Sequence, residues 1–201
     1  VGGLGVDPAA AQTGITKLAG IPGRMEVIDL GQDFMAIVDF AHTPNALQQA
    51  LETARQMTGG RVIVAIGSAG LRDRQKRRMM AQCAIELADY VVLTAEDPRS
   101  ELLDDILAEM AVGANASGGV EGNTYWRVPD RGDAIRKAIS LAQSGDIVLV
   151  CGKGHEQSMC FGKMEYAWDD RMAMRAVLSE LMGVPGPKMP FLPTQTQPQD
   201  Q

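Results

Sequence analysis

The chain has 201 residues, 45% of them hydrophobic, and a formal net charge of −6 at pH 7. This length suits one ordinary domain with attached segments, and the apolar content is enough for a sizeable core. The acidic balance argues against nucleic acid as the main partner, and no apolar run reaches the roughly 18 residues of a membrane helix, so we expect no membrane insertion.

The first part of the chain has three recognisable patterns. Asp7-Pro8 can cap a short helix over Ala9–Leu18, which looks like the end of a preceding domain. Gly20–Gly23 combines glycine and proline and is the predicted linker. The apolar runs Met25–Ile28 and Phe34–Phe40 follow, separated by turn residues, and predict an antiparallel hairpin.

Helical and strand patterns alternate through the middle of the chain. Thr43 followed by Pro44 predicts the start of one helix, and Asp130 predicts the start of another. The glycine-rich stretch Gly113–Gly122 is predicted to be a loop, and the expected strands cover residues 61–67, 90–94, 124–128 and 147–150. The helix side chains expected to face the core are Leu47, Leu51, Ala54, Met57, Met79, Met80, Cys83, Ala84, Leu87, Leu103, Ile106, Met110, Ile135, Ala138, Ile139, Ala142, Val177, Leu178 and Leu181.

The last part of the chain is less regular. Residues 161–168 fit either a hairpin or a loop, and Asp169-Asp170 can cap a final helix. The tail 184–201 is rich in proline and glutamine, so we expect it to be poorly ordered, above all from residue 189 onward. The alternating units predict the α/β class, with a mostly parallel sheet, helices on both of its faces and the N-terminal hairpin at one edge.

The three cysteines are an odd number and lie in or beside apolar segments. This pattern indicates reduced, buried thiols in a cytoplasmic protein. A metal site made of Cys151, His155 and Cys160 is an alternative, but a fourth ligand and a closely spaced cysteine pair are not visible.

The stretch Asp146–Glu156 is the strongest candidate for a site. Its apolar residues predict a strand buried on both faces, and this strand runs directly into Gly152-Lys153-Gly154-His155-Glu156. Glycines at the carboxyl end of a buried strand allow a ligand to approach closely. The spacing of a phosphate-binding P-loop is missing here and elsewhere in the sequence. A solvated glycine turn without a ligand is the alternative interpretation.

Charged groups follow several of the predicted strands. They lie in the stretches Asp39–Pro44, Gly67–Arg74, Glu96–Arg99 and Gly152–Glu156. Each stretch alone fits an ordinary cap or solvated turn. Because parallel strands end at one edge of a sheet, the four together predict a site for a zwitterionic or phosphorylated ligand.

These stretches, together with Gly23–Glu26, resemble the carboxy-terminal domain of the Mur ligase family in matching order. The closest resemblance is to the UDP-N-acetylmuramoyl-tripeptide synthetase type, and it covers roughly residues 20–181. The resemblance implies a Rossmann-like three-layer α/β/α domain that brings an amino acid to a three-domain ligase. Under it, residues 1–20 are the tail of the central ATPase domain or a linker, 21–183 the amino-acid-binding domain, and 184–201 the tail.

The resemblance also implies the reaction and its partners. ATP phosphorylates the carboxylate of UDP-N-acetylmuramoyl-L-alanyl-D-glutamate, and an incoming diamino acid forms the new amide of the peptidoglycan precursor. The main sites for ATP and Mg²⁺ would lie in the other domains, so we expect no catalytic residue here and no activity from this chain alone. The resemblance assigns Arg24, Asp39 and His42 to the nucleotide, and Arg72, Asp97, Arg99, Gly152 and Glu156 to the amino acid.

Within that amino-acid site, Arg72 and Arg99 would hold a carboxylate, while Glu156, Asp97 and a backbone carbonyl near Gly152 would take an ammonium. We expect Glu156 to face the ligand and not to form an ion pair in the core. The family's usual motif for meso-diaminopimelate is Asp-Asn-Pro-Arg, whereas this chain has Glu96-Asp97-Pro98-Arg99, and Leu71 stands where the family often has Asp.

The arginine of this motif favours diaminopimelate, and the additional acid favours L-lysine or L-ornithine. Diaminopimelate is our preferred substrate. Cyanophycin synthetase and folylpolyglutamate synthetase share the domain type and remain alternatives, as does a non-catalytic module that binds an amino acid or nucleotide. A nicotinamide dehydrogenase is disfavoured because no Gly-x-Gly-x-x-Gly follows a strand.

Overall fold

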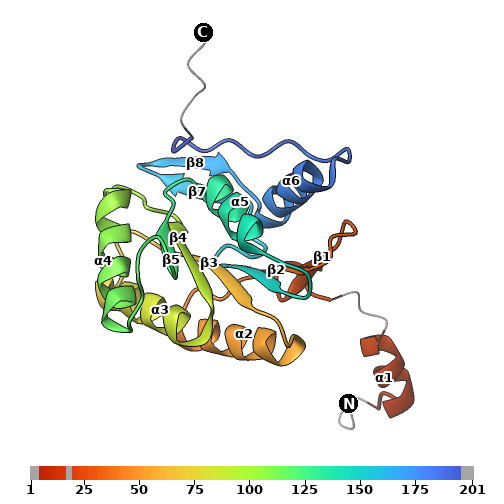
Figure 1. Cartoon of the computed structure of the whole chain (residues 1–201). Helices are drawn as coiled ribbons and strands as arrows, with labels where there is room; N and C mark the ends of the chain where they lie inside the picture. Colours follow the sequence, from red (N-terminus) through yellow and green to blue (C-terminus); the bar gives the residue numbers. More distant parts are fainter. Residues whose placement is uncertain (1–4, 17–19, 196–201) are drawn as a thin grey trace.

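A six-stranded sheet forms the centre of the computed structural model, which describes residues 5–16 and 20–195 (Figure 1). The strand order is β1-β2-β6-β3-β4-β5; β1 pairs antiparallel with β2, and the other pairs are parallel. The strands are β1 (Glu26–Ile28), β2 (Met35–Asp39), β3 (Val62–Ser68), β4 (Tyr90–Ala95), β5 (Tyr125–Arg127) and β6 (Ile147–Cys151). The predicted mostly parallel sheet with an N-terminal hairpin is confirmed.

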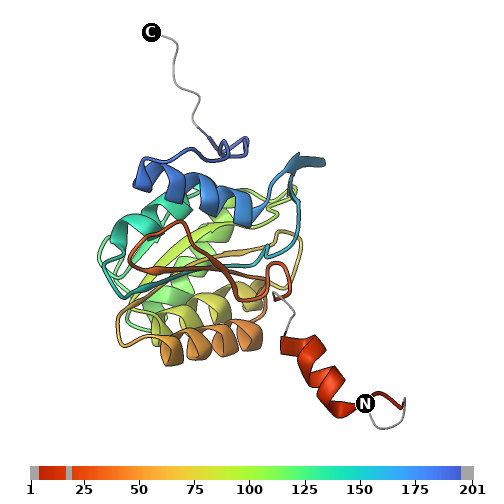
Figure 2. The same cartoon turned by 90° about the vertical axis from the view of Figure 1, so that its right-hand side faces the viewer.

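Helices cover both faces of this sheet, which gives the predicted three layers (Figures 1 and 2). α2, α3 and α4 pack on one face, and α5 and α6 pack on the other. The helices are α1 (Pro8–Thr16), α2 (Pro44–Met57), α3 (Arg74–Leu87), α4 (Leu103–Ala116), α5 (Arg131–Leu141) and α6 (Asp170–Met182). The predicted first helix extended to Leu18, and residues 17–19 lie outside the described residues.

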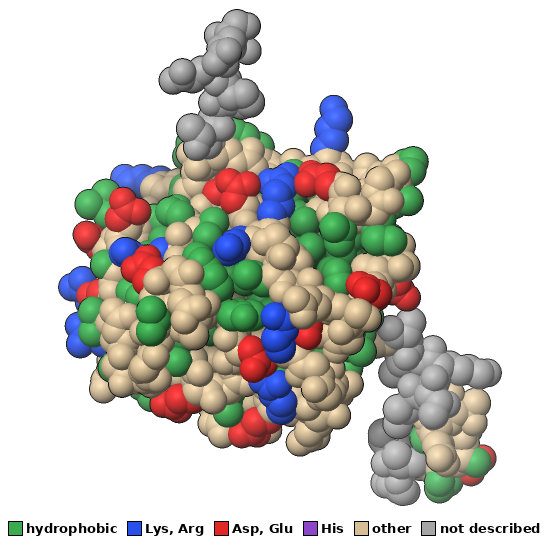
Figure 3. Space-filling view, in the orientation of Figure 1, with side chains coloured by type: hydrophobic (Ala, Val, Ile, Leu, Met, Phe, Trp, Pro, Cys, Tyr) green, Lys and Arg blue, Asp and Glu red, His purple; other side chains and the backbone are tan. Residues whose placement is uncertain are grey.

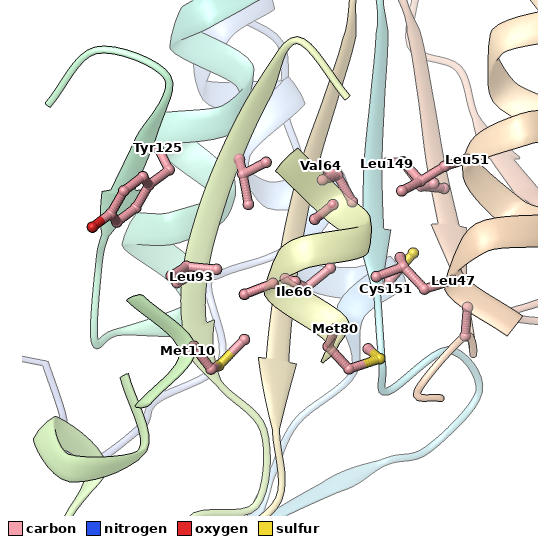
Figure 4. Close-up of a cluster of buried hydrophobic side chains, with 14 of the residues drawn as sticks. Leu47, Leu51, Val64, Ile66, Met80, Leu93, Met110, Tyr125, Leu149 and Cys151 are labelled. Carbon is pink, nitrogen blue, oxygen red and sulfur yellow. The ribbon is translucent and has the colours of Figure 1, made fainter. Parts of the chain in front are cut away.

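The central strands are apolar because they are covered from both sides. All seven residues of β3 are buried, and all five of β6 are buried beside it. Figure 4 shows Val64 and Ile66 of β3 packed with Leu149 of β6 and Leu47 of α2 in the core on the α2 side. The opposite face has its own apolar cluster beneath α5 and α6. This double burial explains why the strands have continuous apolar runs instead of alternation.

The predicted helix starts are present as side-chain caps. Thr43 accepts a hydrogen bond from the backbone N–H of Ala46, with Pro44 in the first turn. Asp130 caps α5 and Asp169 caps α6 in the same way. Each cap satisfies a backbone donor that the helix leaves free, so these helices begin shortly after the preceding strands.

Three side chains predicted to face the core are exposed instead. Met57, Met79 and Leu181 have exposed fractions of 44%, 47% and 56%. The buried stripe on α3 instead includes Arg77, whose guanidinium pairs with Glu101 at 2.8 Å and Glu109 at 2.9 Å. Carboxylates from later in the sequence therefore satisfy this guanidinium. They allow a charged residue to occupy a helix position where the hydrophobic periodicity predicts an apolar residue.

The loop predicted for Gly113–Gly122 is wrong at its beginning, because α4 continues to Ala116. Gly113 lies inside the helix, where a Cβ would collide with the backbone of Arg78 on α3. This glycine therefore serves close packing of two helices and does not end α4.

The C-terminal segments complete the second face. Residues 158–167 form the hairpin β7 (Ser158–Phe161) and β8 (Met164–Ala167), one of the two predicted possibilities. The described part of the predicted disordered tail differs from that expectation. Leu192 is fully buried in the apolar cluster that includes side chains of α5 and α6, and the Thr194 hydroxyl donates to Asp130 at 2.7 Å. Residues 196–201 lie outside the described residues.

On the coloured part of the face in Figure 3, acidic and basic side chains are interspersed. Among the described residues, no helix is long and apolar enough to cross a bilayer.

Candidate functional site

A cavity of about 360 Å³ lies at the carboxyl ends of the central strands. Strand β6 lies between β2 and β3 in the sheet. The chain leaves β2 and β3 toward helices on one face, whereas after β6 it leads to β7, β8 and α6 on the other. Such a divergence opens a crevice at the sheet edge, where ligands bind in open α/β folds.

The cavity brings together all five residues predicted for the amino acid and one predicted for the nucleotide. The predicted residues that line it are His42, Arg72, Asp97, Arg99, Gly152 and Glu156. They follow four different strands, as the strand-end argument required. A cavity of about 370 Å³ at the other ends of the strands has acidic but no basic side chains among its described lining residues, so it offers no clamp for carboxylate or phosphate.

The loop after β4 holds two of these residues in an uncommon backbone conformation. Asp97 and Arg99 have φ values of +39° and +54°, in the left-handed region. The backbone N–H of Arg99 donates to the carbonyl of Cys160 on β7 at 3.0 Å, and its guanidinium donates to the carbonyl of Gly70 at 2.9 Å. These two hydrogen bonds hold the loop in its uncommon conformation and keep the Arg99 side chain along the cavity wall.

A buried lysine, Lys153, pairs with two acids of the cavity wall, which the sequence did not predict. Its buried ammonium lies 2.9 Å from a carboxylate oxygen of Asp97 and 2.7 Å from one of Glu156. The expectation that Glu156 forms no ion pair with a buried group is therefore wrong. The Glu156 side chain is still 42% exposed, so its carboxylate faces the cavity while one oxygen pairs with Lys153.

Glu96 is a further acid of the cavity wall that was not assigned to the site. It is buried, and its Oε2 has no hydrogen-bond partner among the described residues. Burial raises the pKa of this carboxyl, against the opposing charge of Arg131. A Cβ at Gly152 would lie 2.8 Å from Oε2 of Glu96, and the φ of +119° at this position favours glycine at the end of β6.

The predicted nucleotide residues lie at one side of the same rim. The guanidinium of Arg24 stacks on the Phe40 ring at 4.4 Å, and that ring contacts His42 at 4.5 Å and His155 at 4.9 Å. Arg24 lines a neighbouring cavity and not the one described above. The carboxylate of Asp39 accepts the backbone N–H groups of Met25 and Ala41, both at 2.8 Å. Asp39 thereby fixes the turn that presents Arg24.

A fully buried ion pair contacts the ends of two strands that lead to the cavity. Arg131 forms two bonds of 2.7 Å to Asp170, which also accepts the Trp168 indole N–H at 2.8 Å. The same guanidinium donates to the carbonyls of Ala95 and Cys151, each at 2.9 Å. Because these carbonyls end β4 and β6, Arg131 joins the two strand ends that carry Glu96 and Gly152.

No group of three or more His, Cys, Asp or Glu side chains is arranged to hold a metal ion within residues 5–16 and 20–195. Cys151 is fully buried, and burial raises the pKa of its thiol well above the ordinary value. A thiol held protonated is a poor metal ligand, because metals bind the thiolate.

Comparisons with known proteins agree with this geometry. Residues 23–154 match the family model described as Mur ligase, glutamate ligase domain. Over 176 residues the chain is 44% identical to the UDP-N-acetylmuramoyl-L-alanyl-D-glutamate--2,6-diaminopimelate ligase of Geobacillus thermodenitrificans, covering 88% of this chain and 35% of that protein. It is also 45% identical to the UDP-N-acetylmuramyl-tripeptide synthetase of a Roseiflexus species, covering 83% of this chain and 33% of that protein. The chain thus spans about a third of these relatives.

Solved structures show the same relationship. A structure of UDP-N-acetylmuramoyl-L-alanyl-D-glutamate--2,6-diaminopimelate ligase matches with a TM-score of 0.74 and 36% identity, covering 89% of this chain and 36% of that one. A bifunctional folylpolyglutamate synthase/dihydrofolate synthase matches with a TM-score of 0.55 and 23% identity, covering 73% of this chain and 32% of that one. At that identity the second match shows a shared fold only.

Proposed function

The chain belongs to the Mur ligase family by its glutamate ligase domain, and we propose that it is the amino-acid-binding domain of an ATP-dependent UDP-N-acetylmuramoyl-tripeptide synthetase. The complete ligase would add a diamino acid, preferably meso-diaminopimelate, to UDP-N-acetylmuramoyl-L-alanyl-D-glutamate in the cytoplasm. The observation that carries this proposal is the single cavity that contains Arg72, Asp97, Arg99, Gly152 and Glu156. Relatives whose names include 2,6-diaminopimelate support the choice of substrate.

The charges of the cavity fit an amino acid with a zwitterionic distal end. Arg72 and Arg99 can hold a carboxylate through parallel hydrogen bonds. Glu156, whose side chain is 42% exposed at the cavity, can accept an ammonium. This domain would therefore position the attacking amine without supplying a catalytic group of its own.

The nucleotide contacts are the second part of the proposal. Arg24 is exposed and stacks on Phe40, and from there its guanidinium can reach a phosphate oxygen of ATP. Asp39 would act by holding the Arg24 turn, since it binds backbone N–H groups on both oxygens. In the complete ligase, ATP would activate the substrate carboxylate by phosphorylation, with a divalent metal, Mg²⁺ in our proposal, held mainly by another domain.

We also propose the domain limits inferred from the sequence, with residues 21–183 as the amino-acid-binding domain and 1–20 as the end of the ATPase domain or a linker. Two observations support this division. The family match begins at residue 23, and the side chains described in α1 are exposed or half-buried.

The test is ligation by the complete protein that carries this chain. The assay supplies ATP, Mg²⁺, UDP-N-acetylmuramoyl-L-alanyl-D-glutamate and one of three amino acids, and the tripeptide product is identified by mass. We expect product with diaminopimelate. Ligation of glutamate to a folate, or of amino acids to an aspartate polymer, would favour the other ligases of this fold, and amino-acid binding without ADP release would favour a non-catalytic module.

The 201-residue chain alone is expected to release no ADP above the buffer control. Its sequence has no P-loop spacing to hold a triphosphate, so the acyl phosphate cannot form. Coupled detection of ADP with all three substrates present measures this directly. Turnover above the control would show that the activating site lies within this chain.

Replacing Glu156 with glutamine in the complete ligase is expected to raise the KM for the amino acid and to leave the KM for ATP nearly unchanged. Without the exposed Glu156 carboxylate, the site would lose a charge-assisted hydrogen bond to the ligand ammonium. This loss would raise the KM for the amino acid about ten- to a hundred-fold. Glu121→Gln is the matched control, because Glu121 is exposed and pairs with Arg127 at the edge strand β5. Equal losses for both substrates would instead indicate a folding defect.

A further inference from the structure

A buried ammonium lies directly behind the acidic wall of the cavity. The side chain of Lys153 is only 2% exposed, and its Nζ pairs with Asp97 and Glu156 at 2.9 and 2.7 Å. Asp97 also accepts the backbone N–H of Cys160 at 2.9 Å, which fixes its carboxylate beside the Lys153 ammonium. Two of the acids that line the cavity therefore share one internal positive charge.

This pairing changes the charge that a ligand meets. The basic side chains that line the cavity are Arg72, Lys76 and Arg99. Four acidic side chains also line it, namely Asp73, Glu96, Asp97 and Glu156. The acids that line the cavity therefore exceed the lining bases by one. The Lys153 ammonium, which pairs with Asp97 and Glu156, offsets this difference, so the site has no surplus of acid that would favour an ammonium without a carboxylate.

We propose that Lys153 is a positioning residue that sets the substrate preference of this site, by neutralising Asp97 so that Arg99 can select an amino acid with a distal carboxylate. This inference rests on the proposed function. It resolves the conflict in the sequence between the acid at position 97 and the arginine at position 99. Without the internal ammonium, Asp97 and Glu156 would repel the distal carboxylate of diaminopimelate and attract the lone ammonium of lysine.

The test compares kcat/KM for meso-diaminopimelate and L-lysine in the complete ligase. Lys153→Met keeps the apolar stem and removes the charge, and we expect it to lower the diaminopimelate-to-lysine ratio by at least about ten-fold. Asp97→Asn removes one acid while Lys153 remains paired with Glu156, and we expect it to raise the ratio. The double variant restores the wild-type charge balance, so its ratio should return to within about three-fold of wild type.

A purely structural role for Lys153 predicts a different result. In Lys153→Met, kcat/KM would fall equally for both amino acids, so the diaminopimelate-to-lysine ratio would stay unchanged. Adding Asp97→Asn to Lys153→Met would then not restore the lost activity. Any of these results overturns the inference. If Lys153→Met does not fold, an unchanged or lowered ratio in Asp97→Asn overturns the inference by itself. Failure of wild type to ligate either amino acid would instead overturn the proposed function, because the inference concerns only the preference between them.

Discussion

Replacing Asp170 with alanine is expected to lower the free energy of unfolding by about 3 to 5 kcal/mol, because it leaves a fully buried guanidinium without its counter-charge. Arg131 and Asp170 are both 0% exposed and form two bonds of 2.7 Å. The Trp168 indole would lose its acceptor as well. Burial opposes the charge of Arg131, and Asp170 outweighs this effect and raises the pKa of the guanidinium.

Urea unfolding of the chain followed by circular dichroism measures this loss. The matched control is Asp133→Ala in the first turn of α5, where the Asp133 side chain is 58% exposed and pairs with Arg136 at 3.0 Å. An exposed pair of this kind contributes about 0.2 to 1 kcal/mol. Similar losses for the two variants would show that the Arg131 pair does not stabilise the fold as its burial implies.

The fold was predictable wherever the signal is local. Thr43 with Pro44, Asp130 and Asp169 mark helix starts through a side chain and a backbone donor only a few residues apart. The strands were predictable because double burial gives uninterrupted apolar runs. Their polar residues could be placed on one rim because parallel strands share a direction.

The failures involve contacts between residues far apart in the sequence. Arg131 is buried because Asp170, 39 residues later, satisfies it, and Arg77 is buried because of Glu101 and Glu109. Gly113 was interpreted as a loop signal because only the approach of α3 shows why that position lacks a side chain. Leu192 lies in a composition typical of disorder, yet its side chain is fully buried in the apolar cluster on the α5 and α6 face of the sheet.

The candidate site shows the same limit. Residue types and strand ends predicted which side chains would gather, but not how they would pair. Lys153 was visible in the Gly-Lys-Gly-His-Glu stretch, and its i, i+3 spacing to Glu156 was the one available signal. Its second partner, Asp97, is 56 residues away, so this pairing required the structure.

Arg99→Ala in the complete ligase is expected to lower kcat/KM for diaminopimelate by a factor that corresponds to at least about 2 kcal/mol of transition-state stabilisation. The ratio of kcat/KM for diaminopimelate to that for lysine should fall as well. The guanidinium is anchored by the carbonyl of Gly70 at 2.9 Å and lines the cavity. A site built to bond a polar group rejects an analogue that lacks it, because its own group is then left desolvated and unpaired. Lysine and ornithine have no distal carboxylate for Arg99 to bind, so the kcat/KM values for these two amino acids should fall much less in the variant.

Two further variants separate recognition from folding. Arg99→Lys keeps the charge but not the planar pair of donors, so we expect it to recover only part of the activity with diaminopimelate. Arg127→Ala removes an exposed arginine of β5 that pairs with Glu121. This variant should leave the preference for diaminopimelate over lysine unchanged. The measurement is kcat/KM for diaminopimelate, lysine and ornithine in each protein. An unchanged ratio in Arg99→Ala would remove Arg99 from substrate recognition, and a wild type that prefers lysine would mean that Asp97 governs the site despite its pairing with Lys153.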